Sequence, residues 1–454
     1  MKNKIYILYI VLQTILFTDV KAQSYCSTFG AFLSPSYPVS TFTVITNIDT
    51  VITYYGQTFY TKLKISRPIG DILPFTKRPL IIGVHGGGFI SDSISMSSTN
   101  GYLSMFNNMN SAAQFGYIGA SLDYRTGYGK ADENIVLNSL MAPGFPACNF
   151  ITSSIMNKFD DASYRATYDC LKAIDFICKN SSLFPYVDTT QIYLYGSSAG
   201  AIVALNAVLS EANEYCTLPL IEQKPFPTRH KISGVISLSG AVNKATATKL
   251  QSSSINSYTT PLFLAHGNKD TVLSNNTAPL GNCTNITSNY YKYGSSTLSQ
   301  IACNINIPHQ LFLIDNSGHD LGASSPVANT LISSSFTFLY NSGICPSYPL
   351  SIEKLYNLNG DIISQNFCTP VGIIEKNDNV LNFNIYPIPA ESTIKINISD
   401  LNLNRFEVTI YSIVGEIIMR KNDSYEIDIS SLSSGVYILN ITSNGFNGQR
   451  KFVK

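Results

Sequence analysis

The sequence predicts an α/β domain with a mostly parallel sheet flanked by helices, followed by a small all-β domain. Three observations lead to this prediction. Between Pro79 and Gly322, six short apolar runs each end in glycine, serine, aspartate or histidine, as expected for parallel strands buried on both faces. Helical patterns alternate with several of these runs. After about Gly343 the pattern changes to short strands separated by glycine and asparagine turns, which is typical of an all-β unit.

The apolar runs define the expected sheet. They are PLIIGVHGGGF, YIGASLDYR, QIYLYGSSAG, ISGVISLSGA, PLFLAHGNKD and QLFLIDNSGHD. Helical periodicity is found between some of them, in ASYRATYDCLKAIDFICKN and AGAIVALNAVLSEANEY. TFTVITNI and VITYYGQTFYTKLKIS precede the first run and predict a β-rich lead-in. Residues 126–159 and 274–308 are too long for plain turns, so we expect them to pass over the carboxyl edge of the sheet as lid or pocket walls.

Short strands dominate the C-terminal part of the chain. TIKINI, FEVTIYSI, EIIMR, YEIDI, GVYILNIT and QRKFVK alternate as the strands of a small sandwich do. Residues 351–378 lack clear periodicity, and we interpret them as a linker. The expected limits are therefore 23–350 for the α/β domain and 379–454 for the all-β domain.

The composition excludes some classes of partner. The chain has 454 residues, of which 44% are hydrophobic and only 13% are charged, and its formal net charge is +1. No run of lysine and arginine occurs, so the electrostatic attraction that binds nucleic acids or anionic lipids is missing. We expect a folded protein that does not bind nucleic acid.

Residues 1–22 have the pattern of a secretory signal peptide. Lys2 and Lys4 precede the apolar segment 5–17, and Ala22 is a small residue at the expected cleavage position. The apolar segment is shorter than the roughly 20 residues that cross a membrane. We therefore expect cleavage before Gln23 and no membrane span in the mature chain, with an uncleaved anchor helix as the less favoured alternative.

All nine cysteines lie beyond the predicted signal peptide. An exported protein can form disulfides, but an odd number leaves at least one thiol without a partner in the chain. Cys283 with Cys303, and Cys345 with Cys368, are plausible local pairs, although sequence does not determine connectivity. No CxxC motif occurs, and the five histidines have neither HxxH nor HxxxH spacing, so we predict neither a metal site nor a cofactor.

Two adjacent serines in the stretch 196–200, GSSAG, raise the question of which one is a nucleophile. The strand–turn–helix motif G-x-S-x-G exposes its middle residue, with glycines two positions away on both sides. Only Ser198 has both glycines, and Ser197 would then face the packing side. A chance turn is the alternative, but the position between IYLY and a helical pattern favours Ser198.

The stretch 85–89, HGGGF, follows the strand LIIGV and gives a second signal. Consecutive glycines let backbone N–H groups turn toward a ligand without obstruction by Cβ atoms. Together with the N–H of Ala199, this loop would form an oxyanion hole. A glycine-rich loop without a ligand is the alternative.

A histidine and a carboxylate are needed to activate the serine. His319 lies in NSGHDLG after the last sheet strand and is the predicted base. His85 and His266 are interpreted as structural, and His230 and His309 as loop residues. For the acid we favour Asp270, which ends PLFLAHGNKD, because Asp315 and Asp320 are too near the histidine in sequence to reach its ring easily. The resulting chain order, serine then aspartate then histidine, is the one that this type of sheet uses.

From Pro79 to Gly322 the chain resembles the α/β-hydrolase superfamily, specifically its HGGG-bearing carboxylesterases and feruloyl- or acetyl-esterase-like members. The resemblance implies a serine carboxylic-ester hydrolase that forms an acyl-enzyme and acts on a small ester or an acylated polymer. It also implies a triad and an oxyanion hole, made by Ser198, Asp270 and His319, and by the N–H groups of Gly87, Gly88 and Ala199. The stretch Asp123-Tyr124-Arg125 and the pair Arg165 and Asp169 resemble structural motifs of these enzymes.

One departure concerns the acid motif. The D-P-x-x-D motif of hormone-sensitive-lipase-like esterases is absent, and the acid lies in H-G-x-x-D instead. Two alternative functions are a peptidase of the same fold and a non-catalytic surface-binding protein on a hydrolase scaffold.

The C-terminal module resembles the type A sorting domain of the bacterial type IX secretion system. The residues that carry this resemblance are YPIPA at 386–390, Gly415, LSSGVYIL around Gly435 and Tyr437, and the terminal KFVK. Ile388 replaces the usual asparagine. The resemblance implies that the type IX machinery is a partner and that the protein passes through the periplasm to the cell surface or the medium. A generic adhesion sandwich is the alternative.

Overall fold

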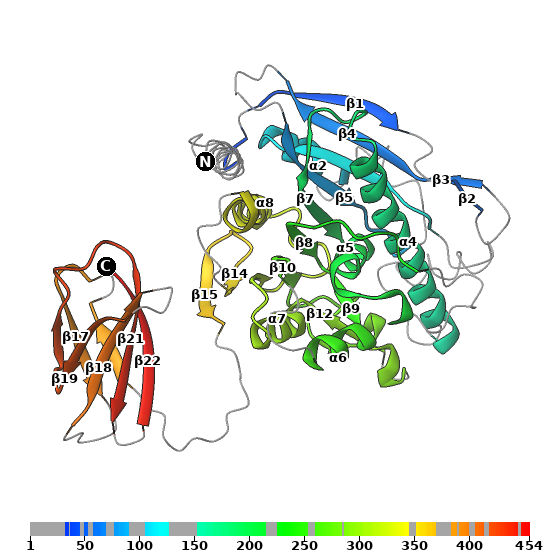
Figure 1. Cartoon of the computed structure of the whole chain (residues 1–454). Helices are drawn as coiled ribbons and strands as arrows, with labels where there is room; N and C mark the ends of the chain where they lie inside the picture. Colours follow the sequence, from blue (N-terminus) through cyan, green and yellow to red (C-terminus); the bar gives the residue numbers. More distant parts are fainter. Residues whose placement is uncertain are drawn as a thin grey trace, which may run out of the picture. The chain divides into compact units, whose positions relative to one another are not determined.

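A computed structural model describes residues 32–35, 37–45, 50–52, 58–69, 77–89, 105–126, 152–214, 225–252, 259–283, 286–344, 351–368, 383–387, 390–398, 405–412, 417–443 and 446–454 (Figure 1). The chain divides into two compact units, Met1–Pro370 and Val371–Lys454. The predicted signal peptide, residues 1–22, lies outside the described residues. No helix in the described part of the chain is long and apolar enough to span a membrane.

A ten-stranded sheet forms the centre of the first unit, in the order β1-β4-β6-β5-β7-β8-β10-β13-β14-β15. Seven neighbouring strands run parallel: β6 (Ile118–Asp123), β5 (Arg78–Val84), β7 (Val187–Ser197), β8 (Gly234–Leu238), β10 (Leu262–Gly267), β13 (His309–Ile314) and β14 (Ile352–Tyr356). Antiparallel strands flank them, namely β1 (Val39–Ile45) and β4 (Lys62–Pro68) on one side and β15 (Ile362–Phe367) on the other. The six apolar runs of the sequence coincide with six of the parallel strands.

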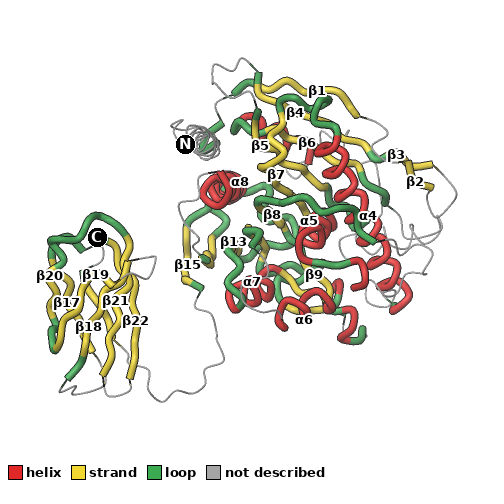
Figure 2. The backbone as a smooth tube through the Cα atoms, viewed as in Figure 1, coloured by secondary structure: helices red, strands yellow, loops and turns green. Residues whose placement is uncertain are grey.

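Helices cover both faces of this sheet (Figure 2). One face packs on α2 (Met105–Gln114) and α8 (Val327–Leu339), and the other on α4 (Ser153–Lys179), α5 (Ala199–Leu209), α6 (Lys244–Ser252) and α7 (Ser295–Asn304). Successive side chains of β7 point to opposite faces of the sheet, so each face has its own hydrophobic core. Ile192 and Leu194 belong to the core on the side of α4 and α5, and Tyr193 and Tyr195 belong to the core on the opposite side. A mostly parallel sheet with helices on both faces is the α/β architecture that the sequence predicts, so the predicted fold class is confirmed.

Shorter elements complete the first unit. They are β2 (Thr50–Ile52), β3 (Thr58–Tyr60), β9 (Ala241–Asn243), β11 (Thr277–Ala278), β12 (Lys292–Gly294), and the helical turns η2 (Ala212–Glu214), η3 (Leu280–Asn282), η4 (Ser288–Tyr290) and η5 (Tyr340–Ile344). β9, β11 and β12 form a separate three-stranded sheet. Helix α7 leads from β12 toward β13, so the end of the 274–308 segment is a regular crossover helix and not an excursion.

The expected linker at 351–378 is wrong for its first half. Residues 352–367 contain β14, which pairs in parallel with β13, and β15, which pairs with β14. Ile362 and Ile363 in β15 are each 51% exposed, and this strand lies at the edge of the sheet. A strand with no buried face shows no alternation of apolar and polar residues, so the hydrophobic pattern of the sequence did not predict this strand.

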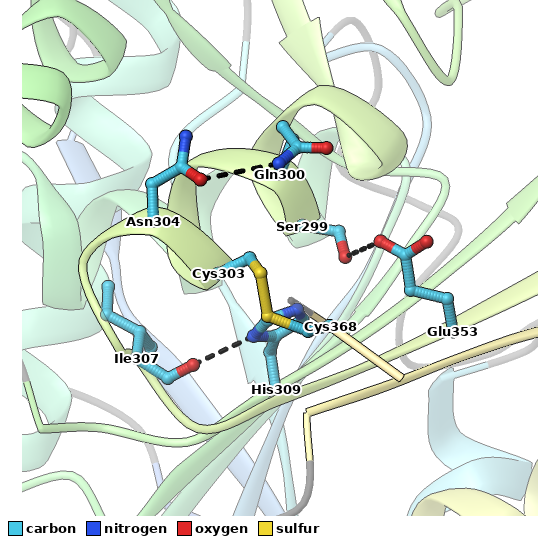
Figure 3. Close-up of a disulfide and its surroundings, with 8 residues drawn as sticks. All are labelled: Ser299, Gln300, Cys303, Asn304, Ile307, His309, Glu353 and Cys368. Carbon is cyan, nitrogen blue, oxygen red and sulfur yellow. Dashed lines mark hydrogen bonds between the residues drawn. A yellow bond between two sulfur atoms is a disulfide. The ribbon is translucent and has the colours of Figure 1, made fainter. Parts of the chain in front are cut away.

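A disulfide joins Cys303, in α7, to Cys368, just after β15 (Figure 3). Cys283 is also disulfide-bonded. The expected pairs Cys283–Cys303 and Cys345–Cys368 are therefore both wrong. Strand β15 brings Cys368 to a Cα–Cα distance of 5.8 Å from Cys303 across 65 residues of sequence, and spatial approach decides pairing rather than spacing along the chain.

His309 lies next to this disulfide (Figure 3). It begins β13, is fully buried, and its Nδ1–H donates to the carbonyl of Ile307 at 2.8 Å. The expectation that His309 is a loop residue is wrong. Among the cysteines that the structure describes, Cys170 and Cys178 in α4 are free thiols.

The second unit consists of two small antiparallel sheets. One contains β16 (Phe383–Tyr386), β17 (Thr393–Ile398) and β20 (Glu426–Asp428), and the other β19 (Ile417–Asn422), β18 (Glu407–Ser412), β21 (Val436–Ser443) and β22 (Phe446–Val453). Both sheets contribute to one core, for example through Ile394 and Leu439. The backbone of Lys454 pairs with Gly435 through two bonds of 2.9 Å. The predicted small all-β domain is confirmed.

Replacing both Cys303 and Cys368 by alanine should lower the free energy of unfolding of the first unit by about 4 kcal/mol, because the bond closes a loop of 65 residues. Urea denaturation of the oxidised protein, followed by far-ultraviolet circular dichroism, measures this change. Cys178→Ser, which alters a free and half-buried thiol, is the control and should change stability far less. Equal stability of the double variant and the wild type would contradict the prediction.

Candidate active site

Ser198 occupies a sharp turn between β7 and α5. Its backbone angles, φ 53° and ψ −118°, lie in a region that residues with side chains rarely adopt. The N–H of Ser198 donates to the carbonyl of Leu238 at the end of β8, at 2.7 Å. A neighbouring strand therefore holds the strained turn in place.

Two glycines make this turn sterically possible. A Cβ atom on Gly196 would lie 2.2 Å from the carbonyl oxygen of Gly200, and one on Gly200 would lie 2.0 Å from that of Val84 in β5. Both distances are far below van der Waals contact. The glycines on either side of Ser198 are thus required by close backbone approach, as expected for the strand–turn–helix motif.

The structure brings Ser198, His319 and Asp270 together at the carboxyl edge of the sheet. Oγ of Ser198 lies 2.8 Å from Nε2 of His319, and Nδ1 of His319 lies 2.6 Å from Oδ2 of Asp270. An ionised carboxylate only accepts hydrogen bonds, so Nδ1 carries the proton and Nε2 accepts from the serine hydroxyl. The serine bonded to the histidine is Ser198, whereas Ser197 is buried at the end of β7.

Asp270 is completely buried at its side chain and is held from several directions. Its Oδ1 accepts the N–H groups of Val272 and Leu273, each at 2.9 Å. Burial alone would favour the neutral acid, but hydrogen bonds from His266 and His319 outweigh it and hold the pKa of the Asp270 carboxyl well below its usual value. The carboxylate therefore stays ionised at neutral pH.

The other two aspartates near the histidine form bonds elsewhere. Oδ1 of Asp315 accepts from the side-chain amide of Asn268 at 2.8 Å. Oδ1 of Asp320 accepts from the N–H of Gly322 at 3.3 Å. His230, in contrast, lies far from this edge and bonds to Asp175 of α4 at 2.9 Å.

The glycine loop after β5 runs beside Ser198. Gly87, Gly88 and Phe89 have consecutive positive φ values of 103°, 60° and 64°. A Cβ atom on Gly86 would lie 3.2 Å from Cβ of Ser198, which places the loop against the proposed nucleophile. Ala199 is the first residue of α5, where backbone N–H groups have no partner within the helix.

Tyr124 supports the glycine loop, a role that the sequence did not reveal. Its hydroxyl donates to the carbonyl of His85 at 2.8 Å, and its ring stacks on the His85 ring at a centroid distance of 4.2 Å. Nδ1–H of His85 in turn donates to the carbonyl of Gly86 at 2.7 Å. The next residue, Arg125, forms an ion pair of 2.7 Å with the buried Asp169, which fixes the end of β6 to α4.

Ser239 is a second supporting residue that sequence reasoning missed. It follows β8, has a φ of 52°, and its hydroxyl donates to the backbone carbonyl of His319 at 3.2 Å. Its N–H donates to the carbonyl of Ala265 at 2.8 Å. A residue other than glycine keeps a positive φ only where the surrounding structure holds it, so this angle marks Ser239 as a constrained position. The amino-acid sequence does not show backbone angles, and the role of Ser239 could not be predicted from it.

The two segments expected as pocket walls contact each other in their described parts. Lys292 of β12 forms an ion pair with Asp160 of α4, and Met156 packs on Cys283 and Ile286. The ring of Phe159 packs edge-on against the ring of Phe89 in the glycine loop, with 5.2 Å between the ring centroids. The rest of the first segment, residues 127–151, lies outside the described residues.

Within the described ranges, no three histidine, cysteine, aspartate or glutamate side chains converge as ligands of a metal ion would. The arrangement around Ser198 has instead the parts that nucleophilic acyl transfer requires: a hydroxyl, an imidazole, a carboxylate and adjacent backbone amides.

Comparison with known proteins identifies the C-terminal part of the chain. Residues 384–454 match the family described as "Secretion system C-terminal sorting domain", which points to export to the cell surface or the medium. A search of curated proteins found no match.

Several solved structures resemble the first unit. A thermophilic esterase from the Planctomycetes species Thermogutta terrifontis shares 14% identity with a TM-score of 0.40, over 68% of this chain and 94% of the esterase. Esterase B from Lactobacillus rhamnosis HN001 shares 13% identity with a TM-score of 0.37, over 75% and 96% of the two chains. The α/β-hydrolase MGS-M1, from a Medee basin deep-sea metagenome library, shares 14% identity with a TM-score of 0.34, over 63% and 84%.

Gly200→Ala should displace the end of β5 from Ser198 and lower both the thermal midpoint and the rate of any reaction at this site, because the new Cβ would overlap the Val84 carbonyl. Circular dichroism and a chromogenic ester assay measure the two effects. The matched control is Gly318→Ala, next to His319, where a Cβ would meet its nearest neighbour only at 4.0 Å. The steric argument fails if both variants behave alike.

Proposed function

We propose that the first unit is a serine carboxylic-ester hydrolase that works through an acyl-enzyme. The observation that supports this proposal best is the hydrogen-bonded series Ser198–His319–Asp270 at a strained turn beside a glycine loop. Three loops that are far apart in sequence supply these side chains. Such a convergence of a hydroxyl, an imidazole and a carboxylate suits nucleophilic catalysis.

In the proposed acylation step, Oγ of Ser198 attacks the ester carbonyl while Nε2 of His319 takes the hydroxyl proton. Asp270 keeps the His319 ring in the Nδ1–H tautomer and stabilises the imidazolium that forms. The tetrahedral oxyanion would accept hydrogen bonds from the N–H groups of Gly87, Gly88 and Ala199, and each such donor typically contributes about 3 kcal/mol. His319 then returns the proton to the leaving alcohol.

Deacylation repeats these roles with water as the nucleophile. His319 takes a proton from the water as it attacks the acyl carbonyl, and Ser198 leaves with that proton restored. Because the pKa of Asp270 is far below neutral, this carboxylate stays charged across the working range. Protonation of Asp270 would therefore not account for a loss of activity on mild acidification.

The principal test compares two adjacent serines. Ser198→Ala in the full chain should lower kcat/KM for p-nitrophenyl esters at least about a thousandfold, since only binding and oxyanion stabilisation would remain. Ser197→Ala is the matched control and should change the rate only modestly. A chain-length series from acetate to palmitate would define the preferred acyl group.

Two outcomes would contradict the esterase proposal. Similar losses in both variants would mean that the nucleophile has been misassigned within the turn. No turnover of any ester by the wild type would favour a non-catalytic binding protein on this scaffold, and turnover of peptides alone would favour a peptidase.

We also propose that residues 1–22 direct export to the periplasm and that the second unit then directs passage across the outer membrane by the type IX machinery. The family match at 384–454 supports the second step. The compact core of this unit is separate from that of the α/β unit, so its removal after transport would leave the hydrolase fold intact.

Deleting residues 384–454 should therefore retain active hydrolase in the periplasm of a host with this secretion system. Ester turnover in the culture medium, on the cell surface and in a periplasmic extract locates the enzyme. Cys178→Ser, which alters a free thiol in α4 of the first unit, controls for effects of mutation on export in general. Undiminished appearance of the truncated enzyme outside the cell would argue against a sorting function.

A further inference from the structure

Asp270 contacts a second imidazole besides that of His319. His266, near the end of β10, is fully buried, and its Nε2 lies 3.2 Å from Oδ2 of Asp270. The same oxygen accepts from Nδ1 of His319 at 2.6 Å. Nε2 of His266 also lies 2.7 Å from the carbonyl oxygen of Leu273, and its Nδ1 lies 2.8 Å from Oγ of Ser295.

The partners of His266 determine where its proton resides. A carbonyl oxygen can only accept a hydrogen bond, so the Leu273 contact requires a proton on Nε2. Nδ1 can then accept from the hydroxyl of Ser295, and both ring nitrogens are satisfied in the neutral form. A neutral ring avoids a buried positive charge, which would compete with His319 for the charge of Asp270.

Nε2–H of His266 therefore donates to the Leu273 carbonyl, and Oδ2 of Asp270 lies 3.2 Å from the same nitrogen. The backbone N–H groups of Val272 and Leu273 hold Oδ1 of the same carboxylate. Asp270 is restrained at both oxygens and has little freedom to rotate away from His319. Among the described residues, the side chains that contact Oδ2 are those of His266 and His319.

We propose that His266 is a positioning residue for the reaction, holding the carboxylate of Asp270 toward His319 as a neutral Nε2–H donor. This inference rests on the proposed function of Ser198. Ser295, the first residue of α7, orients the His266 ring through Nδ1. The structure thus gives a role to a histidine that the sequence marked only as structural.

Charged groups in the adjoining segments are engaged elsewhere. The carboxylates of Asp315 and Asp320, in the segment after β13, accept hydrogen bonds from Asn268 and Gly322. The ammonium of Lys292, in β12, is paired with Asp160. Lys269, beside Asp270, is exposed. The acid and base that His266 can influence are therefore Asp270 and, through it, His319.

The decisive comparison is His266→Asn against His266→Gln in the full chain. Glutamine can place an N–H donor near the position of Nε2, whereas the shorter asparagine cannot reach Asp270. We expect His266→Asn to lower kcat for a p-nitrophenyl ester between about tenfold and a hundredfold, as small misplacements of catalytic groups do. KM should change less than about twofold, and His266→Gln should retain kcat within about threefold.

The split between kcat and KM, together with rescue by the conservative variant, separates positioning from a purely structural role. A displaced Asp270 slows the proton transfers through His319 without changing how the substrate binds. In His266→Asn kcat should therefore fall while KM holds, and in His266→Gln kcat should recover. Thermal midpoints of both variants show whether either has lost its fold.

A measurement on the wild type covers the case in which a variant does not fold. Nitrogen-15 NMR of labelled histidine should show His266 protonated at Nε2 and unprotonated at Nδ1 from pH 6 to pH 8. A ring protonated at both nitrogens, or at Nδ1 alone, would overturn the proposal.

The kinetic outcomes distinguish the two proposals. If Ser198→Ala is inactive while His266→Asn keeps the wild-type kcat, the positioning role is wrong and the hydrolase function stands. If Ser198→Ala retains wild-type turnover, the proposed function itself fails.

Discussion

The hydrogen bonds that join His319 to Ser198 and to Asp270 depend on one property of the sheet: its parallel strands end at a common edge. β7, β10 and β13 each deliver one of these side chains to that edge, directly or through the loop that follows. The distances of 2.6 and 2.8 Å leave no room for a shift of strand register. A slip of a single residue would turn each side chain to the opposite face.

Close backbone packing enforces that register at the strained turn. Gly200 contacts the end of β5 so closely that no side chain fits, and Leu238 of β8 accepts the N–H of Ser198. The glycine loop, supported by Tyr124, then lies beside the hydroxyl. The strain at Ser198 persists because two neighbouring strands and the first turn of α5 all constrain it.

Electrostatics at the site follow from how Asp270 is buried. Burial without partners would keep the carboxyl neutral, and a neutral acid could not stabilise an imidazolium. Two backbone amides and two imidazoles compensate for the lost hydration. These fixed donors offset the cost of desolvation and also orient the carboxylate. The same contacts therefore keep Asp270 charged and hold it in place.

Local sequence determined a large part of this protein. Apolar runs and helical periodicity were enough to predict the parallel sheet, and glycine spacing was enough to single out Ser198, because a strained turn leaves a steric signature in neighbouring residues. Asp270 and His319 were selected from chain order, and the structure places both within hydrogen-bond distance of their predicted partners.

Tertiary structure alone decided features that arise from contacts between distant segments. β15 is an exposed strand at the edge of the sheet, so apolar and polar residues do not alternate along it. The pairing of β14 and β15 with the sheet brings Cys368 to Cys303. The supporting positions of Tyr124, Ser239 and His266 likewise depend on which loops meet at the edge. The local sequence determines which residues form strands, helices and tight turns. Strand pairing and side-chain contacts between distant segments depend on where the folded chain places those segments.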